Sequence, residues 1–389
     1  MGLLGQIINC SSLKLAVYGQ IVLGAVTIVL LYLICLKLLN SEALALCLSG
    51  FLGLNFQILN YQATVLTESL ATTLLMAVLY VHITSINERI TAKRFFVLAS
   101  VDSLFVMVRP NFILLPASLY ALHVLYILAV SKSKGERLNT AASGLWVIVL
   151  GISFNLTLVA IWSTLYYLKT GQLGLSRTAE FNLLGKNIQY GYLDQERADA
   201  PPLARRVREI YQELQHDQDP YSIIKRLGDE DLFSRENLAA INSYFITGRR
   251  ADFAIKTMQL FPVVLKKDVH FYYGKPNGSI ENPLLHFINQ GFNAFNAFNV
   301  KAFVFASGLA VWLLVKKKQQ QFMILIMILA TIFYHLLTIT AFGYSEYPRL
   351  RVPIDLLLNV LVVLPLCVLA LYADALLKQR LAETPARTA

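Results

Sequence analysis

The amino-acid sequence predicts an all-α membrane protein that crosses the bilayer about nine times, with its N-terminus outside and its C-terminus in the cytoplasm. Of its 389 residues, 56% are hydrophobic and only 15% are charged, and the mean hydropathy is +0.55. Soluble domains carry roughly one quarter charged residues, so this composition indicates a membrane protein.

Nine apolar stretches are the predicted spans, since a helix of about 17–25 apolar residues can cross a bilayer. The fourth stretch is short and ends at Arg109, because the following Pro110 disfavours helix in the residue before it. The nine stretches are Val17–Leu36, Ala43–Leu59, Ser69–Ile86, Phe95–Val108, Phe112–Val130, Leu145–Tyr167, Val300–Val315, Phe322–Ala341 and Pro353–Tyr372.

Basic residues set the predicted orientation. They follow the odd-numbered spans, and short cytoplasmic loops are the ones that carry an excess of Lys and Arg. The stretch Arg177–Glu281 holds 15 basic and 15 acidic residues, so the net charge of +10 comes from the short loops predicted to be cytoplasmic. Nucleic acid is therefore not an expected partner. The basic clusters are Lys37; Arg89, Lys93 and Arg94; Lys132, Lys134 and Arg137; Lys316, Lys317 and Lys318; and Lys378 with Arg380.

The predicted spans divide the chain into four parts: spans one to six in 1–168, a non-cytoplasmic loop in 169–299, spans seven to nine in 300–373, and a cytoplasmic tail in 374–389. The loop is too long to be a simple connection. It contains apolar residues at helical spacing, and we expect a small helical layer. These residues are Leu203, Val207, Ile210, Tyr211 and Leu214, and further helices are expected at Phe233–Thr247 and, on the membrane surface, at Ala251–Leu265.

Three segments on the non-cytoplasmic side carry the candidate site. Charged side chains near a membrane are costly and usually functional. Arginine suits phosphate oxygens and tyrosine adds neutral donors, whereas a carboxylate such as Glu68 suits a divalent metal or a sugar hydroxyl. The alternative is interfacial anchoring, for which arginine and tyrosine are also common. The candidate substrate-binding residues are Glu68, Arg109, Tyr344, Glu346, Tyr347, Arg349 and Arg351.

Asp102 lies within a span, seven positions before Arg109. A structural contact with a neighbouring helix is favoured over a buried site or an ion path. Three histidines of the long loop are candidates to join Glu68 at a metal, and the sequence singles out none of them: His216, His270 and His286.

The segments Thr67-Glu68-Ser69-Leu70, Val108-Arg109-Pro110-Asn111 and Glu346-Tyr347-Pro348-Arg349-Leu350-Arg351-Val352-Pro353 resemble those of the integral-membrane GT-C glycosyltransferases. The subgroup is similar to protein O-mannosyltransferases and aminoarabinose transferases, the family 39 type. This resemblance implies a hexosyl- or pentosyltransferase that takes sugar from a polyprenyl- or dolichyl-phosphate. The acceptor would be a glycan, lipid or protein, and the location the plasma (inner) membrane of a bacterium.

The resemblance also implies roles for single residues. Glu68 would lie near the metal or the sugar, Arg349 and Arg351 would meet the donor phosphate, and Arg109 would support the cavity. The family places its catalytic acid in a first outer loop after an N-terminal helix, but Met1–Leu13 holds no Asp or Glu. Together with the outside N-terminus, this leads us to expect an N-terminally truncated chain whose catalytic residue is unknown.

Two other membrane functions are alternatives. An O-antigen ligase or polymerase also uses lipid-linked glycans and a large outer loop, and would have its essential residues in that loop. A transporter would have repeated halves, broken helices and polar residues near the midplane, whereas the sequence shows no repeat and Asp102 is its only acid deep in a span. A catalytically incomplete fragment that binds donor lipid is the third alternative.

Overall fold

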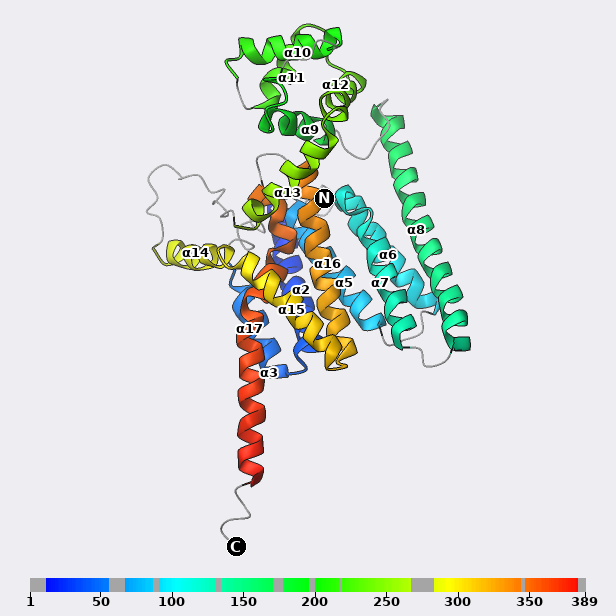
Figure 1. Ribbon diagram of the computed structural model, residues 1–389, viewed down its shortest axis with the longest axis vertical. Coiled ribbons are helices and arrows are strands. Elements are labelled where there is room, and N and C mark those ends of the chain that lie inside the picture. The colour runs from blue at the N-terminus through cyan, green and yellow to red at the C-terminus, as the bar shows by residue number, and fades with distance from the viewer. Residues whose placement is uncertain are drawn as a thin grey trace. The chain divides into compact units, whose positions relative to one another are not determined.

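The computed structural model describes residues 12–55, 67–86, 91–130, 134–170, 178–195, 200–216, 219–266, 283–343 and 347–383. All regular elements in these ranges are helices, as predicted (Figure 1). The chain forms two compact units. Unit 1 comprises Met1–Leu156, Asp268–Phe333 and Val352–Ala389, and unit 2 comprises Thr157–Lys267 and Tyr334–Arg351.

The helices of unit 1 are long and apolar. Helix α2 packs against α3 and α5, and α5 packs against α6. Their bounds are α2 Ser12–Leu39, α3 Glu42–Gly53, α5 Thr67–Ser85, α6 Ala92–Val108, the 3-10 turn η1 Pro110–Phe112, α7 Leu115–Val130, α14 Pro283–Asn296 and α15 Asn299–Val315; α8 Lys134–Thr170, α16 Gln319–Phe342 and α17 Tyr347–Glu383 begin or end in unit 2.

Six helices among the described residues are long and apolar enough to cross a membrane. They correspond to six of the nine predicted spans. A seventh span is possible if α14 and α15, which meet at 55°, are counted together. Helix α6 has 17 residues and α3 only 12. At 1.5 Å per residue, α3 is about 18 Å long, well below the roughly 30 Å of a bilayer's hydrocarbon core.

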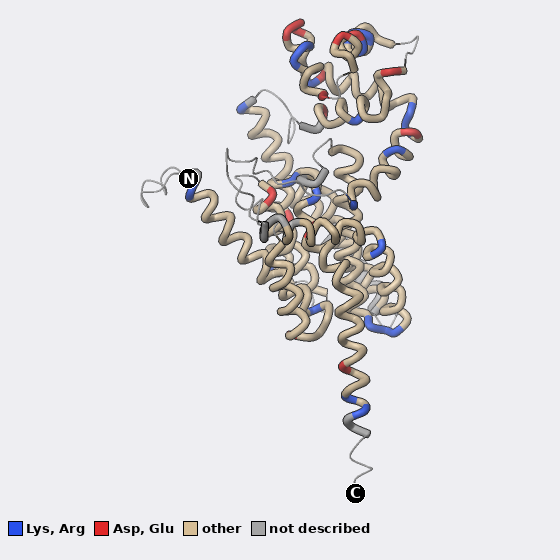
Figure 2. The backbone as a smooth tube through the Cα atoms, turned by 90° about the vertical axis from the view of Figure 1, so that its left-hand side faces the viewer, with Lys and Arg blue, Asp and Glu red and all other residues tan. Residues whose placement is uncertain are grey.

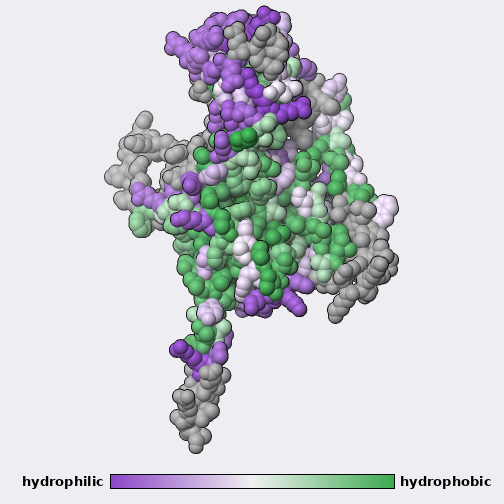
Figure 3. Space-filling view, viewed as in Figure 1, coloured by the Kyte–Doolittle hydropathy of each residue, from purple (hydrophilic) through white to green (hydrophobic). Residues whose placement is uncertain are grey.

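The surface of unit 1 fits a lipid environment. Apolar side chains cover much of the visible face of its helices (Figure 3), and charged residues are rare along them (Figure 2). Large apolar side chains such as Val22, Leu104 and Leu125 are exposed. Polar contacts lie inside instead: the Thr27 and Thr73 hydroxyls are 2.8 Å apart and join α2 to α5. The apolar exterior supports membrane insertion, because soluble proteins rarely expose patches of this extent.

Unit 2 contains a helical layer with its own hydrophobic core. Helices α9 Thr178–Gln189, α10 Pro202–Glu213, α11 Pro220–Asp229, α12 Arg235–Thr247 and α13 Arg250–Lys266 surround it. The predicted apolar helical pattern is confirmed in and next to α10. Val207, Ile210 and Tyr211 are buried, and Leu203 and Leu214 pack against the core. The core consists of Leu184, Ile188, Tyr190, Tyr192, Leu193, Ala204, Val207, Ile210, Tyr211, Ile223, Leu227, Leu238, Ile241 and Phe245.

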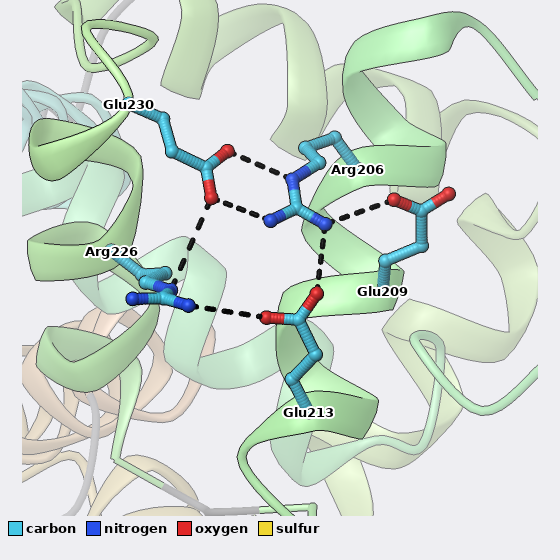
Figure 4. Close-up of polar contacts among 5 residues, drawn as sticks. All are labelled: Arg206, Glu209, Glu213, Arg226 and Glu230. Carbon is cyan, nitrogen blue, oxygen red and sulfur yellow. Dashed lines mark hydrogen bonds and ion pairs between the residues drawn. The ribbon is translucent and has the colours of Figure 1, made fainter.

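A charged network joins α10 to α11 on the surface of this layer (Figure 4). Arg206 donates two hydrogen bonds to Glu230, at 2.8 and 2.5 Å. It also donates to Glu209 and Glu213, and Arg226 bridges Glu213 and Glu230. The hydrogen bonds from Arg206 lower the pKa of Glu230. A bidentate arginine–carboxylate pair fixes geometry as well as charge, so the network sets how α10 and α11 meet.

A lysine lies inside the same layer. Lys186 is fully buried, and its amino group lies 5.6 Å from the centre of the Tyr190 ring. Burial lowers its pKa from 10.5 to about 7. Next to it, Asn187 donates a 2.9 Å hydrogen bond to the Asn242 side chain, which ties α9 to α12. The lysine therefore adds an ionisable group to a core that is otherwise held by apolar and amide contacts.

Replacing Lys186 with Met should stabilise the helical layer by roughly 3–5 kcal/mol at pH 6, because the unfolded lysine is easier to protonate than the buried one. Between pH 7 and 10.5 the unfolded chain binds a proton that the folded layer does not, so the stability of the natural protein should rise with pH across that interval. Pulse proteolysis in urea at several pH values measures both effects.

The exposed Lys225 of α11 provides the matched control. Lys225→Met should leave the urea midpoint and its pH dependence unchanged. An equal response of the two variants would show that burial of Lys186 does not govern the stability of the layer.

Candidate functional site

Two of the predicted site residues form a buried ion pair in unit 1. Nη2 of Arg109 donates to Oε1 of Glu68 at 3.0 Å, and the two side chains are 13% and 1% exposed. Their chain segments are 41 residues apart. The structure therefore brings together two of the three segments that carry the candidate site.

Local sequence explains both positions. Glu68 lies in the first turn of α5, where a negative side chain complements the positive end of the helix dipole. Arg109 follows the last residue of α6 and has extended-type backbone angles of φ −135° and ψ 85°. Pro110 disfavours helix at Arg109, and so ends α6 there. The start of α5 and the end of α6 are thereby joined by opposite charges.

The third predicted segment belongs to unit 2 and is described in part. Tyr344 and Glu346 lie outside the described residues. Tyr347 and Arg349 stand in the first turn of α17, and their side chains are not described. The roles assigned to these four residues stay predictions.

Arg351 is described fully and is completely buried. Its Nη1 donates to the backbone carbonyls of Val264 and Leu265, at 2.7 and 2.9 Å. These carbonyls belong to the last turn of α13, where helix carbonyls have no partner in the helix and favour a cation. Arg351 was predicted to contact a donor phosphate. In the structure, its Nη1 instead donates hydrogen bonds to the C-terminus of α13.

His335 holds the same segment from α16. Its Nε2 lies 2.8 Å from the Leu350 carbonyl. A carbonyl oxygen only accepts hydrogen bonds, so Nε2 carries the proton. His335 and Arg351 are both fully buried, and together they connect the start of α17 to α16 and α13.

Asp102 has a partner that the sequence did not identify. His82 of α5 places Nε2 at 3.3 Å from both carboxylate oxygens, and both side chains are buried. The prediction of a polar contact with a neighbouring helix is confirmed. The predicted spans contain three histidines, His82, His123 and His335, and no sequence spacing distinguishes His82 as the partner.

Further contacts extend this polar layer to α7 and α8. The Tyr120 ring meets His82 edge-on, with ring centres 5.0 Å apart. A Cβ added at Gly151 would lie 2.8 Å from the Tyr120 ring, so a glycine is needed where α8 passes. One helical position away from Asp102, Ser103 donates to the Asn155 side chain at 2.6 Å. Polar contacts of this kind hold membrane helices together.

Among the described residues, no three His, Cys, Asp or Glu side chains are placed so that they could hold a metal ion together. His216 contacts Asp194 at 3.0 Å. His270 lies outside the described ranges, and the side chain of His286 is not described. A divalent metal near Glu68 therefore stays a prediction.

Comparison of the chain with protein-family models, with curated proteins and with solved structures gives no match. The resemblance to GT-C glycosyltransferases rests on the short segments around Glu68, Arg109 and Arg349.

Breaking the Glu68–Arg109 pair should be costly, because one charge would remain buried without its partner. We expect Arg109→Met or Glu68→Leu to destabilise the protein by about 3–5 kcal/mol each, and the double variant by much less than the sum. Unfolding by sodium dodecyl sulfate in mixed micelles measures the coupling energy.

The exposed pair Asp374–Lys378 at the end of α17, with 2.7 Å between its charged atoms, serves as the control. Its coupling should stay below about 1 kcal/mol. Equal coupling energies for the two pairs would contradict a structural role for the burial of Glu68.

Proposed function

We propose that the protein is a glycosyltransferase that moves a sugar from a polyprenyl- or dolichyl-phosphate to an acceptor on the non-cytoplasmic face of the membrane. The observation that carries the proposal is the buried Glu68–Arg109 pair at the joined ends of two apolar helices. A carboxylate and a guanidinium held together at a membrane border suit a substrate that combines a sugar with a phosphate.

The orientation follows from helix α6. Lys93 and Arg94 stand at its beginning, and Arg109 follows its end, about 25 Å away for a 17-residue helix. The positive-inside rule places the beginning of α6 in the cytoplasm, so the Glu68–Arg109 pair belongs to the opposite side.

The other basic residues of unit 1 agree with this orientation. The C-terminal end of α2 and the turn between α15 and α16 lie at the same end of unit 1 (Figure 1). Lys37 is in the last turn of α2, and Lys316–Lys318 form the turn. Nine crossings with an outside N-terminus and a cytoplasmic tail remain our proposal for the topology.

The reaction would be displacement at the anomeric carbon. The acceptor hydroxyl oxygen forms the new bond to this carbon, the bond from the carbon to the phosphate oxygen breaks, and the lipid phosphate leaves with the bonding electrons. A carboxylate takes the acceptor proton. Cationic groups stabilise the charge that grows on the leaving phosphate, as arginine or a divalent metal does in other phosphate-releasing sites.

Among the arginines, Arg349 is our candidate for the phosphate contact. Nη1 of Arg351 is engaged with α13, two residues further along the chain. Glu68 would bind the sugar or a metal, with Arg109 holding its carboxylate in place. Tyr344 and Tyr347 would add hydroxyl donors and Glu346 a further carboxylate. The residue that takes the acceptor proton is not assigned.

A transporter is the second candidate, and the observation that bears on it is the His82–Asp102 pair. Ionisable residues inside membrane-spanning helices often mark substrate or proton paths. Both side chains are nearly inaccessible, and each partner satisfies the other. This closed arrangement fits a structural contact better than an open path.

Replacing Arg349 with Ala should lower the release of polyprenyl phosphate from polyprenyl-phosphate sugars by about 100-fold or more, since lost charge stabilisation acts on the transition state. Purified protein in nanodiscs, supplied with a panel of donors and glycan or lipid acceptors, allows the product to be quantified by mass spectrometry. Arg380→Ala, near the other end of α17, is the control and should retain turnover. Unchanged turnover in Arg349→Ala would refute the assigned role.

A further inference from the structure

Helix α13 is apolar on two opposite sides. One side packs in unit 2: Thr257, Val264 and Leu265 are buried, and Phe253 and Leu260 pack on the hydrophobic core. The other side is exposed. A second apolar side that is left exposed on a partly polar helix is typical of a contact surface.

The exposed side is a continuous stripe. Ile255, Met258 and Val263 are 57%, 51% and 52% exposed. Ala254 and Ile255 are exposed, and so are Met258 and Pro262, which follow them at helical spacing of three or four residues. They therefore lie on one face of the helix. A shallow depression runs between Ala254, Ile255, Met258 and Gln259. We call the residues Ala254, Ile255, Met258 and Pro262 the α13 stripe.

The stripe is unusual within the helical layer formed by α9 to α13. Among the described residues of α9 to α12, only Tyr221 is a large exposed hydrophobic side chain. The apolar residues of those four helices form most of the hydrophobic core, and charged residues recur along the backbone of this layer (Figure 2). Single exposed apolar side chains are ordinary, but a contiguous apolar face usually marks a contact surface.

The C-terminal end of α13 is fixed to the start of a membrane-spanning stretch. Arg351 donates to the last carbonyls of α13, and Leu350 is the first residue of the candidate span Leu350–Arg380 in α17. His335 fixes the Leu350 carbonyl from the α16 side. The end of α13 is therefore fixed next to the residue at which this candidate span begins.

Basic residues stand at both ends of the stripe. Arg250 begins α13 and Lys266 ends it, and both are exposed. The acidic residue of the helix, Asp252, is paired with Lys256 at 3.1 Å. Anionic lipid headgroups attract basic residues next to a membrane surface, at about 1 kcal/mol per residue.

We propose that α13 lies in the plane of the membrane interface and inserts the α13 stripe among lipid acyl chains, with Arg351 as its anchor. The occupant is a lipid surface, because the anchor sets the depth of the helix and the flanking charges complement anionic headgroups. The inference concerns how unit 2 meets the bilayer, and it holds for any reaction that the protein performs.

The test uses full-length protein in nanodiscs that contain anionic lipid, with Cys10, Cys35, Cys47 and Cys367 replaced by Ser or Ala. Single cysteines at Ile255 and at Met258 carry an environment-sensitive fluorophore. Both side chains are exposed, so these changes remove no core contact. A fraction of the lipids carries a nitroxide quencher at a shallow acyl position.

The label at either position should emit at shorter wavelength and lose at least half of its intensity to the quencher. Tyr221→Cys on α11 is the matched control, since Tyr221 is 58% exposed in the same unit, and its label should not be quenched. Equal quenching at Met258 and Tyr221 would overturn the proposal. A label that is shielded from water but not quenched by lipid would also overturn it, and would indicate a protein partner such as a second copy of the chain.

Discussion

An ion pair that is almost wholly removed from water holds together the ends of α5 and α6. A lone carboxylate with the burial of Glu68 would cost several kcal/mol, and the guanidinium of Arg109 compensates that cost only while its geometry is kept. The pair therefore requires α5 to begin and α6 to end at the same level. Pro110 determines where α6 ends, because proline disfavours helix in the residue before it. Helix α6 therefore stops where Arg109 faces Glu68.

The two units are stabilised by different physics. In unit 1 the driving force for helices to associate is weak, since lipid is as apolar as their side chains, and polar contacts supply specificity. The His82–Asp102, Ser103–Asn155 and Thr27–Thr73 contacts join α5 to α6, α6 to α8 and α2 to α5, at about 0.5–1 kcal/mol each. In unit 2, helices α9 to α12 bury a hydrophobic core, as in a soluble protein. A charged network on the surface of this layer orients α10 relative to α11 and contributes little to the free energy of unfolding.

Helix positions were predictable because apolar runs and helical spacing are local properties of the sequence. The helices α10, α12 and α13 appear where the pattern placed them, and the described helices include one at each of the nine predicted spans. Span length was less predictable: α3 ends at Gly53, and the run Ala43–Leu59 gave no local signal for that end. The bend between α14 and α15 was not predicted either.

Partners of polar side chains were harder to predict than helices. Glu68 and Arg109 were assigned to one candidate site because the predicted topology puts their segments at one membrane face, but the sequence did not identify them as an ion pair. The contact of Arg351 with α13 could not be predicted, since 86 residues separate Arg351 from Leu265. The acceptor is also a backbone carbonyl, so the sequence contains no acidic residue that would identify it as the partner. Asp102 and His82 are each one of several polar residues in spans, and only the packing of α5 on α6 selects this pair.

In the topology that we propose for unit 1, the Glu68–Arg109 pair and the basic turn between α15 and α16 lie on opposite sides of the membrane. Labelling with a membrane-impermeant maleimide distinguishes the two sides, with single cysteines placed at Lys317 and at the exposed Thr67, next to Glu68, in a cysteine-free chain. We expect Thr67→Cys to react in intact cells and Lys317→Cys to react only after the membrane is permeabilised. Reaction of both positions from the same side, or the reverse pattern, would rule out this topology.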